Sequence, residues 1–238
     1  LQTMLGSPGN TTITRCFSTG TVSANANATS TDLAARSGGI ANITIDYSLG
    51  NIIISQCYST GNISAENVFG PAYAGGITGE MGNKQSNSIT IDRCYATGNV
   101  EADSPTGSDG AGGIAGNVYT SGFNNTLFIR YCAALNKEIN ASDSYRRIIA
   151  AYDGTQSLNN NIAYSGMKLN GGTVAPGDGD TQSGYNGASK SKAELTTSAD
   201  TTFRSIFSGF DSTWHWVSGY PYPVFLWQNS APAYTPLP

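Results

Sequence analysis

The stretch Ser88–Ala102 reads SITIDRCYATGNVEA, and the chain contains this pattern four times in recognisable form. Each copy carries one cysteine, and the four are separated by 41, 37 and 38 residues: Cys16, Cys57, Cys94 and Cys132. A Gly-Gly-Ile element keeps a similar spacing, and its second glycines recur every 37 residues, at Gly39, Gly76 and Gly113. Two independent markers that share one period indicate a structural repeat.

Within a unit the side chains alternate with a period of two residues, which is typical of a β-strand. Ile89 and Ile91 therefore face one side of a strand. Ile91 and Cys94 are three residues apart, so they share the interior only if the chain turns a corner between them. After this corner small and aliphatic residues point inward, and aromatic residues point outward at Phe17, Tyr58 and Tyr95.

A unit of this kind cannot bury its apolar face alone and must stack on its copies. Strands that are separated by corners and repeated along one axis predict an all-β fold, a parallel β-helix (β-solenoid) of about four to five coils. Successive coils would lie about 4.8 Å apart, with equivalent residues on top of one another. The Gly-Gly pairs are interpreted as corners, where glycine allows either a positive φ or a close approach of stacked coils.

These two elements resemble GLUG repeats, in which a Gly-Gly-aliphatic-x-Gly element precedes an Ile-x-x-Cys-Tyr-Ala-Thr-Gly-x-Val element. The match is clearest at Gly75–Gly79 followed by Ile91–Val100, and the resemblance covers roughly residues 11 to 166. It implies a right-handed β-helix and the secreted or cell-surface setting of bacterial adhesin-like proteins, but no shared catalytic residues. The first copy departs from the motif, because Asn42 stands where the closing glycine is expected.

The composition excludes several classes of protein. Charged residues make up only 12% of the 238 residues and the formal net charge is −4, whereas nucleic-acid binding needs a basic surface. No run of about 18 apolar residues occurs, so no transmembrane helix is predicted. The length suits one domain with a cap, and we expect a monomer.

Changes in composition divide the chain into three parts. Residues 1–166 hold the repeats, residues 167–190 form an irregular loop or last coil, and residues 191–238 form a C-terminal cap with a Pro-rich tail. Ser191 or Ser198 is expected to begin one or two short helical turns. All three tryptophans lie in the cap, which we expect to cover the open end of the solenoid as an aromatic lid. A carbohydrate-stacking patch is the alternative role for this cluster.

The four cysteines allow two interpretations. Stacked coils bring their Cα atoms to a distance that a disulfide tolerates, but side chains on neighbouring parallel strands point the same way, so the sulfur atoms are poorly aimed. We therefore favour buried free thiols that behave as small apolar side chains. A linear column of thiols does not match the tetrahedral geometry of a zinc site, so no metal is predicted.

Residues suited to catalysis are scarce. His215 is the only histidine and is interpreted as structural, and neither catalytic residues nor a cofactor is predicted. A β-helix that cleaves polysaccharides would need converging carboxylates or a carboxylate beside a cation; the outward candidates are Asp46, Asp92, Arg15, Arg93 and Arg130. The basic pair Arg146 and Arg147 is expected in a solvated loop.

The function we predict is that of a non-catalytic adhesion or binding module, secreted or exposed on a bacterial surface, for glycans or for host and cell-surface proteins. A solenoid offers a long rigid face, and the candidate binding residues are the outward row Phe17, Tyr58 and Tyr95. Simple stacking of these rings within the ladder is the other interpretation. Two further functions stay open: a carbohydrate-active enzyme (a polysaccharide lyase or hydrolase), and a passive stalk within a larger surface protein.

Overall fold

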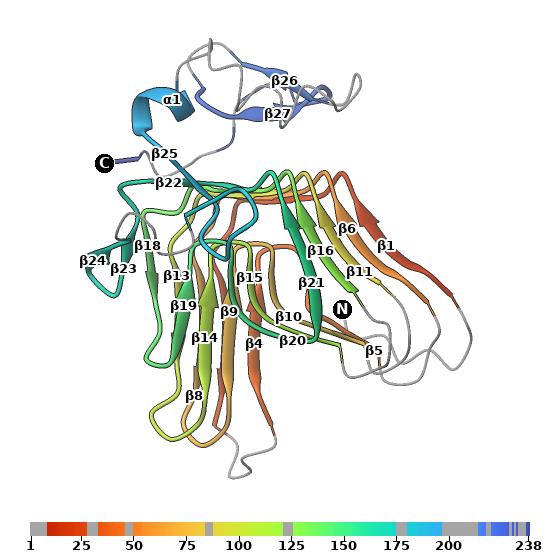
Figure 1. The fold of residues 1–238 in the computed structure, drawn as a ribbon, viewed down its shortest axis with the longest axis vertical. Coiled ribbons are helices and arrows are strands. Elements are labelled where there is room, and N and C mark those ends of the chain that lie inside the picture. The colour runs from red at the N-terminus through yellow and green to blue at the C-terminus, as the bar shows by residue number, and fades with distance from the viewer. Residues whose placement is uncertain are drawn as a thin grey trace.

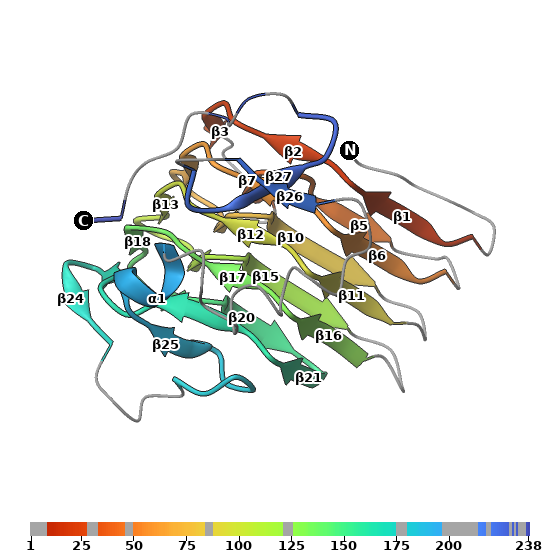
Figure 2. The same cartoon turned by 90° about the horizontal axis from the view of Figure 1, so that it is seen from above.

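The computed structural model describes residues 9–27, 33–45, 50–83, 88–120, 126–174, 180–196, 214–217 and 220–228, together with 230, 232, 237 and 238. Within them the regular secondary structure is almost entirely β-strand, and the chain winds into a parallel β-solenoid (Figure 1). The chain runs anticlockwise in Figure 1 while its coils advance toward the viewer, as Figure 2 shows from above, so the solenoid is right-handed. The predicted fold is confirmed.

Three of the five sheets that wall the solenoid follow one another along each coil. Sheet A precedes the cysteine corner and contains β1 (Thr11–Thr14), β6 (Ile52–Ser55), β11 (Ile89–Asp92), β16 (Thr126–Arg130) and β21 (Thr155–Asn159). Sheet B follows that corner and contains β2 (Phe17–Ser18), β7 (Tyr58–Ser59), β12 (Tyr95–Ala96), β17 (Ala133–Ala134), β22 (Ile162–Tyr164) and β25 (Ala188–Lys190). Sheet C contains β3 (Val22–Ala26), β8 (Ile63–Asn67), β13 (Val100–Asp103), β18 (Glu138–Asn140), β23 (Lys168–Leu169) and the antiparallel β24 (Gly172–Thr173).

Two four-stranded sheets complete each coil. Sheet D contains β4 (Ala35–Gly38), β9 (Ala72–Gly75), β14 (Asp109–Gly112) and β19 (Ser144–Arg146). Sheet E contains β5 (Ile43–Ile45), β10 (Thr78–Asn83), β15 (Ala115–Thr120) and β20 (Ile149–Asp153). Four coils thus give one strand to every sheet, whereas the chain that follows them adds strands only to sheets A, B and C.

Each coil is bent into two arms in cross-section (Figure 1). Sheets A and E are the walls of one arm, and sheets C and D are the walls of the other. Sheet B crosses the outer side of the bend, while the Gly-Gly corner between sheets D and E lies on its inner side.

Columns of like residues fill the interior, as the repeat predicts. The parallel register places Ile54 between Ile13 and Ile91, and Ile91 against Ile129. Ile54, Ile91 and Ile129 are fully buried, and burial of each such side chain stabilises the fold by about 1.5–3 kcal/mol. Stacking of identical apolar residues therefore holds the coils in register.

The corner between sheets A and B depends on a left-handed residue that is not glycine. The equivalent positions in the five coils have φ values of 57°, 52°, 55°, 54° and 55°: Arg15, Gln56, Arg93, Tyr131 and Asn160. The cysteine that follows is a free thiol in each of the first four coils. The Sγ atom of Cys94, for example, lies 3.4 Å from the Asp92 carbonyl oxygen, within hydrogen-bonding distance. Cys16 is exposed, contrary to expectation, because it belongs to the outermost coil.

The corner between sheets D and E needs glycine for close approach and not for a positive φ. Among the described glycines a positive φ occurs at Gly154, Gly171 and Gly187, outside these pairs. A methyl group on Gly76 would lie 2.2 Å from the carbonyl oxygen of Gly113 in the next coil. Of the two roles expected for the Gly-Gly pairs, close stacking is therefore the one observed.

Arg147 is fully buried, so the expectation of a solvated Arg146–Arg147 pair was wrong for the second residue. The register aligns Arg146 with Gly112, so the pair takes the place of the Gly-Gly corner in the fourth coil. The Arg147 guanidinium donates from Nη2 to the Gly187 carbonyl at 2.9 Å and from Nη1 to Ser189 Oγ at 3.0 Å. Burial lowers the pKa of Arg147 to about 10, so it stays charged at neutral pH. The Arg147 side chain therefore connects the corner between sheets D and E of the fourth coil to β25 by hydrogen bonds.

The C-terminal segment packs on the flank of the solenoid, and not on its end as expected. Strands β26 (Trp214–Trp216) and β27 (Pro223–Phe225) pair antiparallel and lie over β2, β7 and β12 of sheet B (Figure 2). The outward aromatic row of sheet B provides the apolar surface on which the aromatic side chains of these strands pack. Before this segment, α1 (Lys192–Thr196) begins at Ser191, whose Oγ accepts from the Glu194 amide, as predicted for an N-cap.

The close contact between neighbouring coils predicts that the same Gly→Ala substitution has opposite effects on stability at two equivalent positions. A methyl group on Gly61 would lie 1.9 Å from the Gly20 carbonyl oxygen, whereas nothing lies within 4 Å of one on Gly20. We expect Gly61→Ala to lower the free energy of unfolding by about 1–3 kcal/mol. Gly20→Ala should change it by less than about 1 kcal/mol, in the stabilising direction. Urea denaturation followed by circular dichroism tests this, and equal effects of the two substitutions would contradict it.

The buried guanidinium predicts a second pair of unequal effects. Arg147→Ala leaves the Gly187 carbonyl and Ser189 without their charged donor, so we expect a loss of about 3–5 kcal/mol in unfolding free energy. Arg146→Ala removes the neighbouring exposed charge and should cost less than about 0.5 kcal/mol. Thermal unfolding of the two variants compares them, and a mild effect of Arg147→Ala would mean that the side chain is not needed at the corner.

Candidate functional site

The predicted aromatic row forms a continuous stack on the outer face of sheet B. The rings of Phe17 and Tyr58 lie 5.2 Å apart at an angle of 18°, and those of Tyr58 and Tyr95 lie 4.9 Å apart at 2°. The parallel register places the three residues directly opposite one another. The expected ladder of rings is therefore present, and the distance between the rings follows the spacing of the coils.

The cap covers most of this stack. Tyr58 and Tyr95 are fully buried, whereas Phe17 is 38% exposed. The Tyr58 hydroxyl donates to Gln228 Oε1 at 2.8 Å, and the Tyr95 hydroxyl donates to the Pro223 carbonyl, also at 2.8 Å. Two of the three predicted binding residues are thus inaccessible, because the outward rings form the surface on which the cap packs.

An exposed margin of aromatic rings remains at the first coil. Trp227 is 61% exposed, and its ring lies 5.5 Å from that of Phe17 at an angle of 48°. Phe225 backs Trp227 in a stacked arrangement, at 5.5 Å and 17°. We call Phe17 and Trp227 the aromatic platform. An exposed tryptophan beside a second exposed ring forms an apolar surface, and contiguous apolar surfaces mark interaction sites.

The sequence assigned Trp227 to the aromatic cap but did not single it out. Of the three tryptophans, Trp214 is only 8% exposed, and it packs on Phe225 at 4.5 Å. Alternation along the chain does not separate these two environments, because they depend on where the cap docks. The exposure of Phe17 has the same origin, since the cap reaches Tyr58 and Tyr95 and leaves the edge of the row open.

Of the carboxylates proposed for an enzyme, the structure describes Asp92 and places it beside two arginines. Asp92 accepts from Arg93 Nη1 at 3.1 Å and from Arg130 Nε at 3.0 Å on sheet A, so the expected carboxylate beside a cation is present. Glu80, which the sequence did not single out, is buried on sheet E and pairs with Arg36. Asp92 and Glu80 stand on different sheets, so these two do not form the carboxylate pair that glycoside hydrolysis needs. Arg15 instead donates to Gln56 Oε1 at 3.3 Å, and Asp46 lies outside the described residues.

Within the described ranges, no group of three or more His, Cys, Asp or Glu side chains converges as metal ligands would. His215 lies in β26, between two tryptophans of the cap. The single helix in this part of the chain, α1, has five residues, and no described helix is long and apolar enough to cross a membrane.

Comparison with known proteins places the chain among parallel β-solenoids. No protein-family model and no curated protein sequence matches it. Its fold is similar to that of a crystal structure titled "putative immunoglobulin A1 protease" from Bacteroides ovatus, with a TM-score of 0.65 and 24% identity. The match covers 92% of this chain and 58% of that one. At this level of identity the likeness concerns the fold alone, and the chain spans little more than half the length of its neighbour.

Burial of the row predicts a pH dependence of the cap. Burial raises the pKa of Tyr58 to about 12, against about 10 in the unfolded chain. Neutral Tyr58 therefore contributes stability that is complete below pH 10 and is lost as the pH rises through about 12. We expect the tryptophan emission to shift to longer wavelength over this window as the cap loosens. Tyr58→Phe cannot ionise and should reduce the shift, and identical pH profiles of both proteins would contradict the assignment.

Proposed function

We propose that the chain is a non-catalytic module, secreted or exposed at the bacterial surface, that binds glycans through the aromatic platform. The observation that carries this proposal is the 61% exposure of Trp227 beside the exposed ring of Phe17. A ligand that covers this exposed indole ring removes apolar surface from water, and this burial contributes favourable free energy to binding.

The chemistry of the platform suits a sugar ring. The face of an aromatic ring carries partial negative charge, and the C–H groups on one face of a pyranose carry partial positive charge. A pyranose that stacks on Trp227 would therefore combine apolar contact with electrostatic attraction. The stack of Phe225 behind Trp227 fixes the ring, so little conformational entropy is lost when a ligand binds.

The scaffold supports a binding role. A solenoid holds its surface rigid over several coils, and the docking of the cap on sheet B links the platform to that frame through buried rings. The resemblance of the repeats to GLUG repeats adds the extracellular or cell-surface setting and the adhesin-like role, and both stay part of the proposal. A carbohydrate-active enzyme is the alternative, and the pairing of Asp92 with Arg93 and Arg130 agrees with it as well, so the exposed platform is the feature that favours the binding role.

The name of the structural neighbour suggests a link with proteolysis, but within the described residues no serine or cysteine is hydrogen-bonded to the single histidine, His215. The neighbour is also longer than this chain, so a catalytic part of such a protein would have room elsewhere. A binding module or a stalk that accompanies a catalytic domain agrees with that likeness. The platform favours the binding module, because a passive stalk has no need of an exposed tryptophan.

Removal of the platform tests the proposal. A glycan array with the wild-type protein should identify ligands, and Trp227→Ala should weaken their binding about tenfold or more, which is the loss expected from one aromatic contact of about 1.5 kcal/mol. Phe69→Ala is the matched control, because Phe69 is also exposed (42%) but follows β8 in the other arm. An array without any ligand, or equal binding by wild type and Trp227→Ala, would refute the role. Attachment to cells that depends on Trp227 but survives enzymatic removal of surface glycans would identify a protein partner instead.

A further inference from the structure

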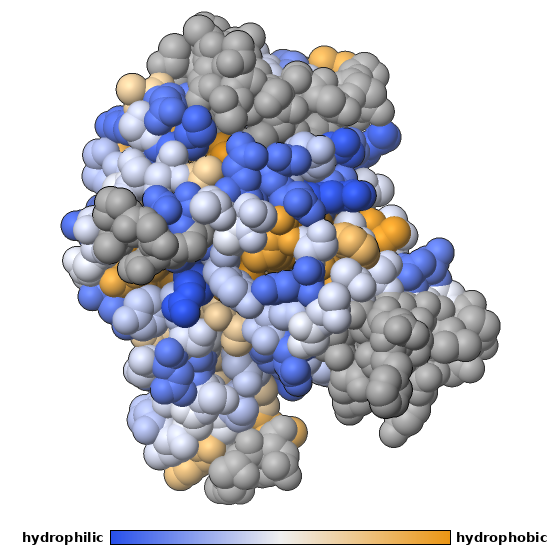
Figure 3. Space-filling view, in the orientation of Figure 1, coloured by the Kyte–Doolittle hydropathy of each residue, from blue (hydrophilic) through white to orange (hydrophobic). Residues whose placement is uncertain are grey.

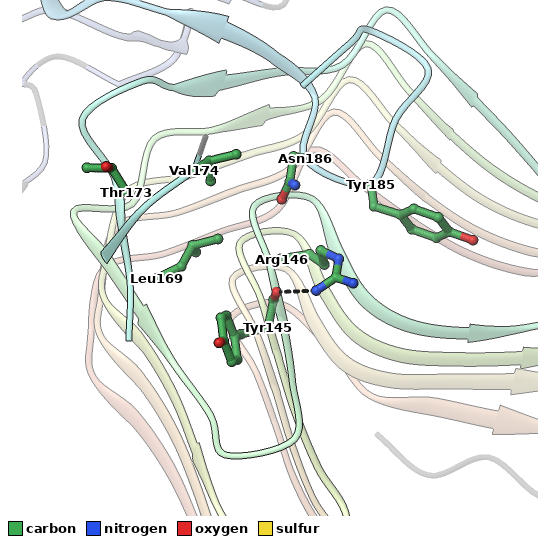
Figure 4. A pocket seen from close by; sticks show the side chains of 7 residues that line it. All are labelled: Tyr145, Arg146, Leu169, Thr173, Val174, Tyr185 and Asn186. Atoms are coloured by element: carbon green, nitrogen blue, oxygen red, sulfur yellow. Dashed lines mark hydrogen bonds between the residues drawn. The ribbon is translucent and has the colours of Figure 1, made fainter. Parts of the chain in front are cut away.

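The end of the solenoid at the fifth coil contains a cavity of about 580 Å³. It exists because sheets D and E stop at β19 and β20, while sheets A, B and C continue into the fifth coil. The missing strands leave a space that is bordered by the β23–β24 hairpin and by the segment before β25 (Figure 4). A volume of this size is within the range of small-molecule sites, which is about 300–1,000 Å³.

The floor of the cavity is made of interior positions that no further coil covers. Tyr145 is in register with Ala111, which is in register with Ala74, so the last coil has a large ring where the earlier coils have methyl groups. Leu169 continues the interior column of Ile139 and is also only partly buried. Figure 3 looks onto this end of the molecule and shows apolar side chains gathered between polar ones.

Arg146 brings a positive charge to the mouth of the cavity. It aligns with Gly112 and Gly75 of the earlier coils. A methyl group on Gly75 would lie 1.9 Å from the Thr78 carbonyl oxygen of the same coil and 2.7 Å from the Gly116 amide nitrogen of the next coil. Arg146 replaces this glycine in the fourth coil, where sheets D and E end and no further described strand lies above it. Its Nη1 donates to the Tyr145 carbonyl at 3.0 Å, and the side chain makes no ion pair within the described part of the chain (Figure 4).

The remaining wall offers aromatic and hydrogen-bonding groups. Tyr185 is 39% exposed, and its hydroxyl accepts from Gln156 Nε2. Asn186 is held in place because its Oδ1 accepts from the Arg147 amide at 3.1 Å. Thr173 adds a hydroxyl on the side of β24. Among the described residues that line the cavity there is one cation and no carboxylate, with aromatic rings below and polar groups at the rim.

We propose that this end cavity binds a carboxylated saccharide, a uronic or sialic acid residue, through Arg146. The guanidinium presents two parallel N–H donors that match a carboxylate. Tyr145, Leu169 and Tyr185 provide apolar contact for the sugar ring, while the hydroxyl groups at the rim pair with those of the sugar. A single cation suits a singly charged carboxylate better than a phosphate dianion. This site lies apart from the aromatic platform and does not depend on it.

Calorimetric titration with matched ligands tests the proposal and separates the two sources of the carboxylate. Sialyllactose is compared with lactose, and trigalacturonate with its methyl ester. The wild-type protein should bind one or both acids at least tenfold more tightly than the neutral partner, and added salt should weaken that binding. Equal binding of acid and neutral ligand, or no binding of either acid, would overturn the proposal.

Four variants locate the binding. Arg146→Gln should lower the affinity for the acid at least tenfold, and Tyr185→Ala should lower it as well while keeping the backbone bonds that Tyr185 makes to Ile148. Arg15→Gln is the charge-matched control at the opposite end, where Gln56 already occupies the equivalent corner. Trp227→Ala should keep the preference for the acid over the neutral ligand, because Arg146 supplies that preference, so a failure of the platform hypothesis is distinguishable from a failure of this one. Wild-type affinity in both Arg146→Gln and Tyr185→Ala would place the ligand elsewhere.

Discussion

The contact of each coil with the next, at the distance of paired backbones, is the constraint on which the rest of the structure depends. Hydrogen bonds run from coil to coil even at the corners, as from the Tyr95 amide to the Cys57 carbonyl at 3.1 Å and from the Ile77 amide to the Ile114 carbonyl at 2.9 Å. Side chains near the axis of the bend have no room at this spacing, which explains glycine at Gly76 and Gly113. Identical residues can therefore stack in columns only if the backbone of every coil follows the same path.

The same constraint explains why the ends of the stack differ from its middle. The interior column of Ile52, Ile89 and Leu127 begins with Thr11 and ends with Gln156, because terminal coils meet water on one side. At the cysteine position of the fifth coil stands Asn161, whose side chain binds the Cys132 amide and the Ile129 carbonyl. Arg146 and Arg147 belong to this series, since they occupy a corner that no complete coil covers. The end of a solenoid is therefore where chemically distinct side chains can gather.

The outer face of sheet B shows that an outward position is not the same as an exposed one. Tyr58 and Tyr95 point away from the interior of the coil, yet they form a second core with Phe225 and Tyr222 of the cap. The stacked rings form a broad apolar surface on which the cap packs. Their hydroxyl groups donate hydrogen bonds to acceptors in the cap, Gln228 Oε1 and the Pro223 carbonyl. The aromatic rings that remain exposed lie at the margin of this second core, where Phe17 and Trp227 meet water.

The sequence by itself determined the repeat, the parallel stacking and the position of the cysteine corner, and it favoured free thiols and a helix N-cap at either Ser191 or Ser198. Each of these depends on residues close in the chain, or on a period that the chain displays directly. It did not determine that the cap lies on the flank, that Arg147 is buried or that a cavity opens beside Arg146. These features follow from which strands the fifth coil lacks and from where the last residues return to the stack. Only the tertiary structure decides them, because they join segments with no common period, and their free energy comes from surfaces that exist only after the coils have formed.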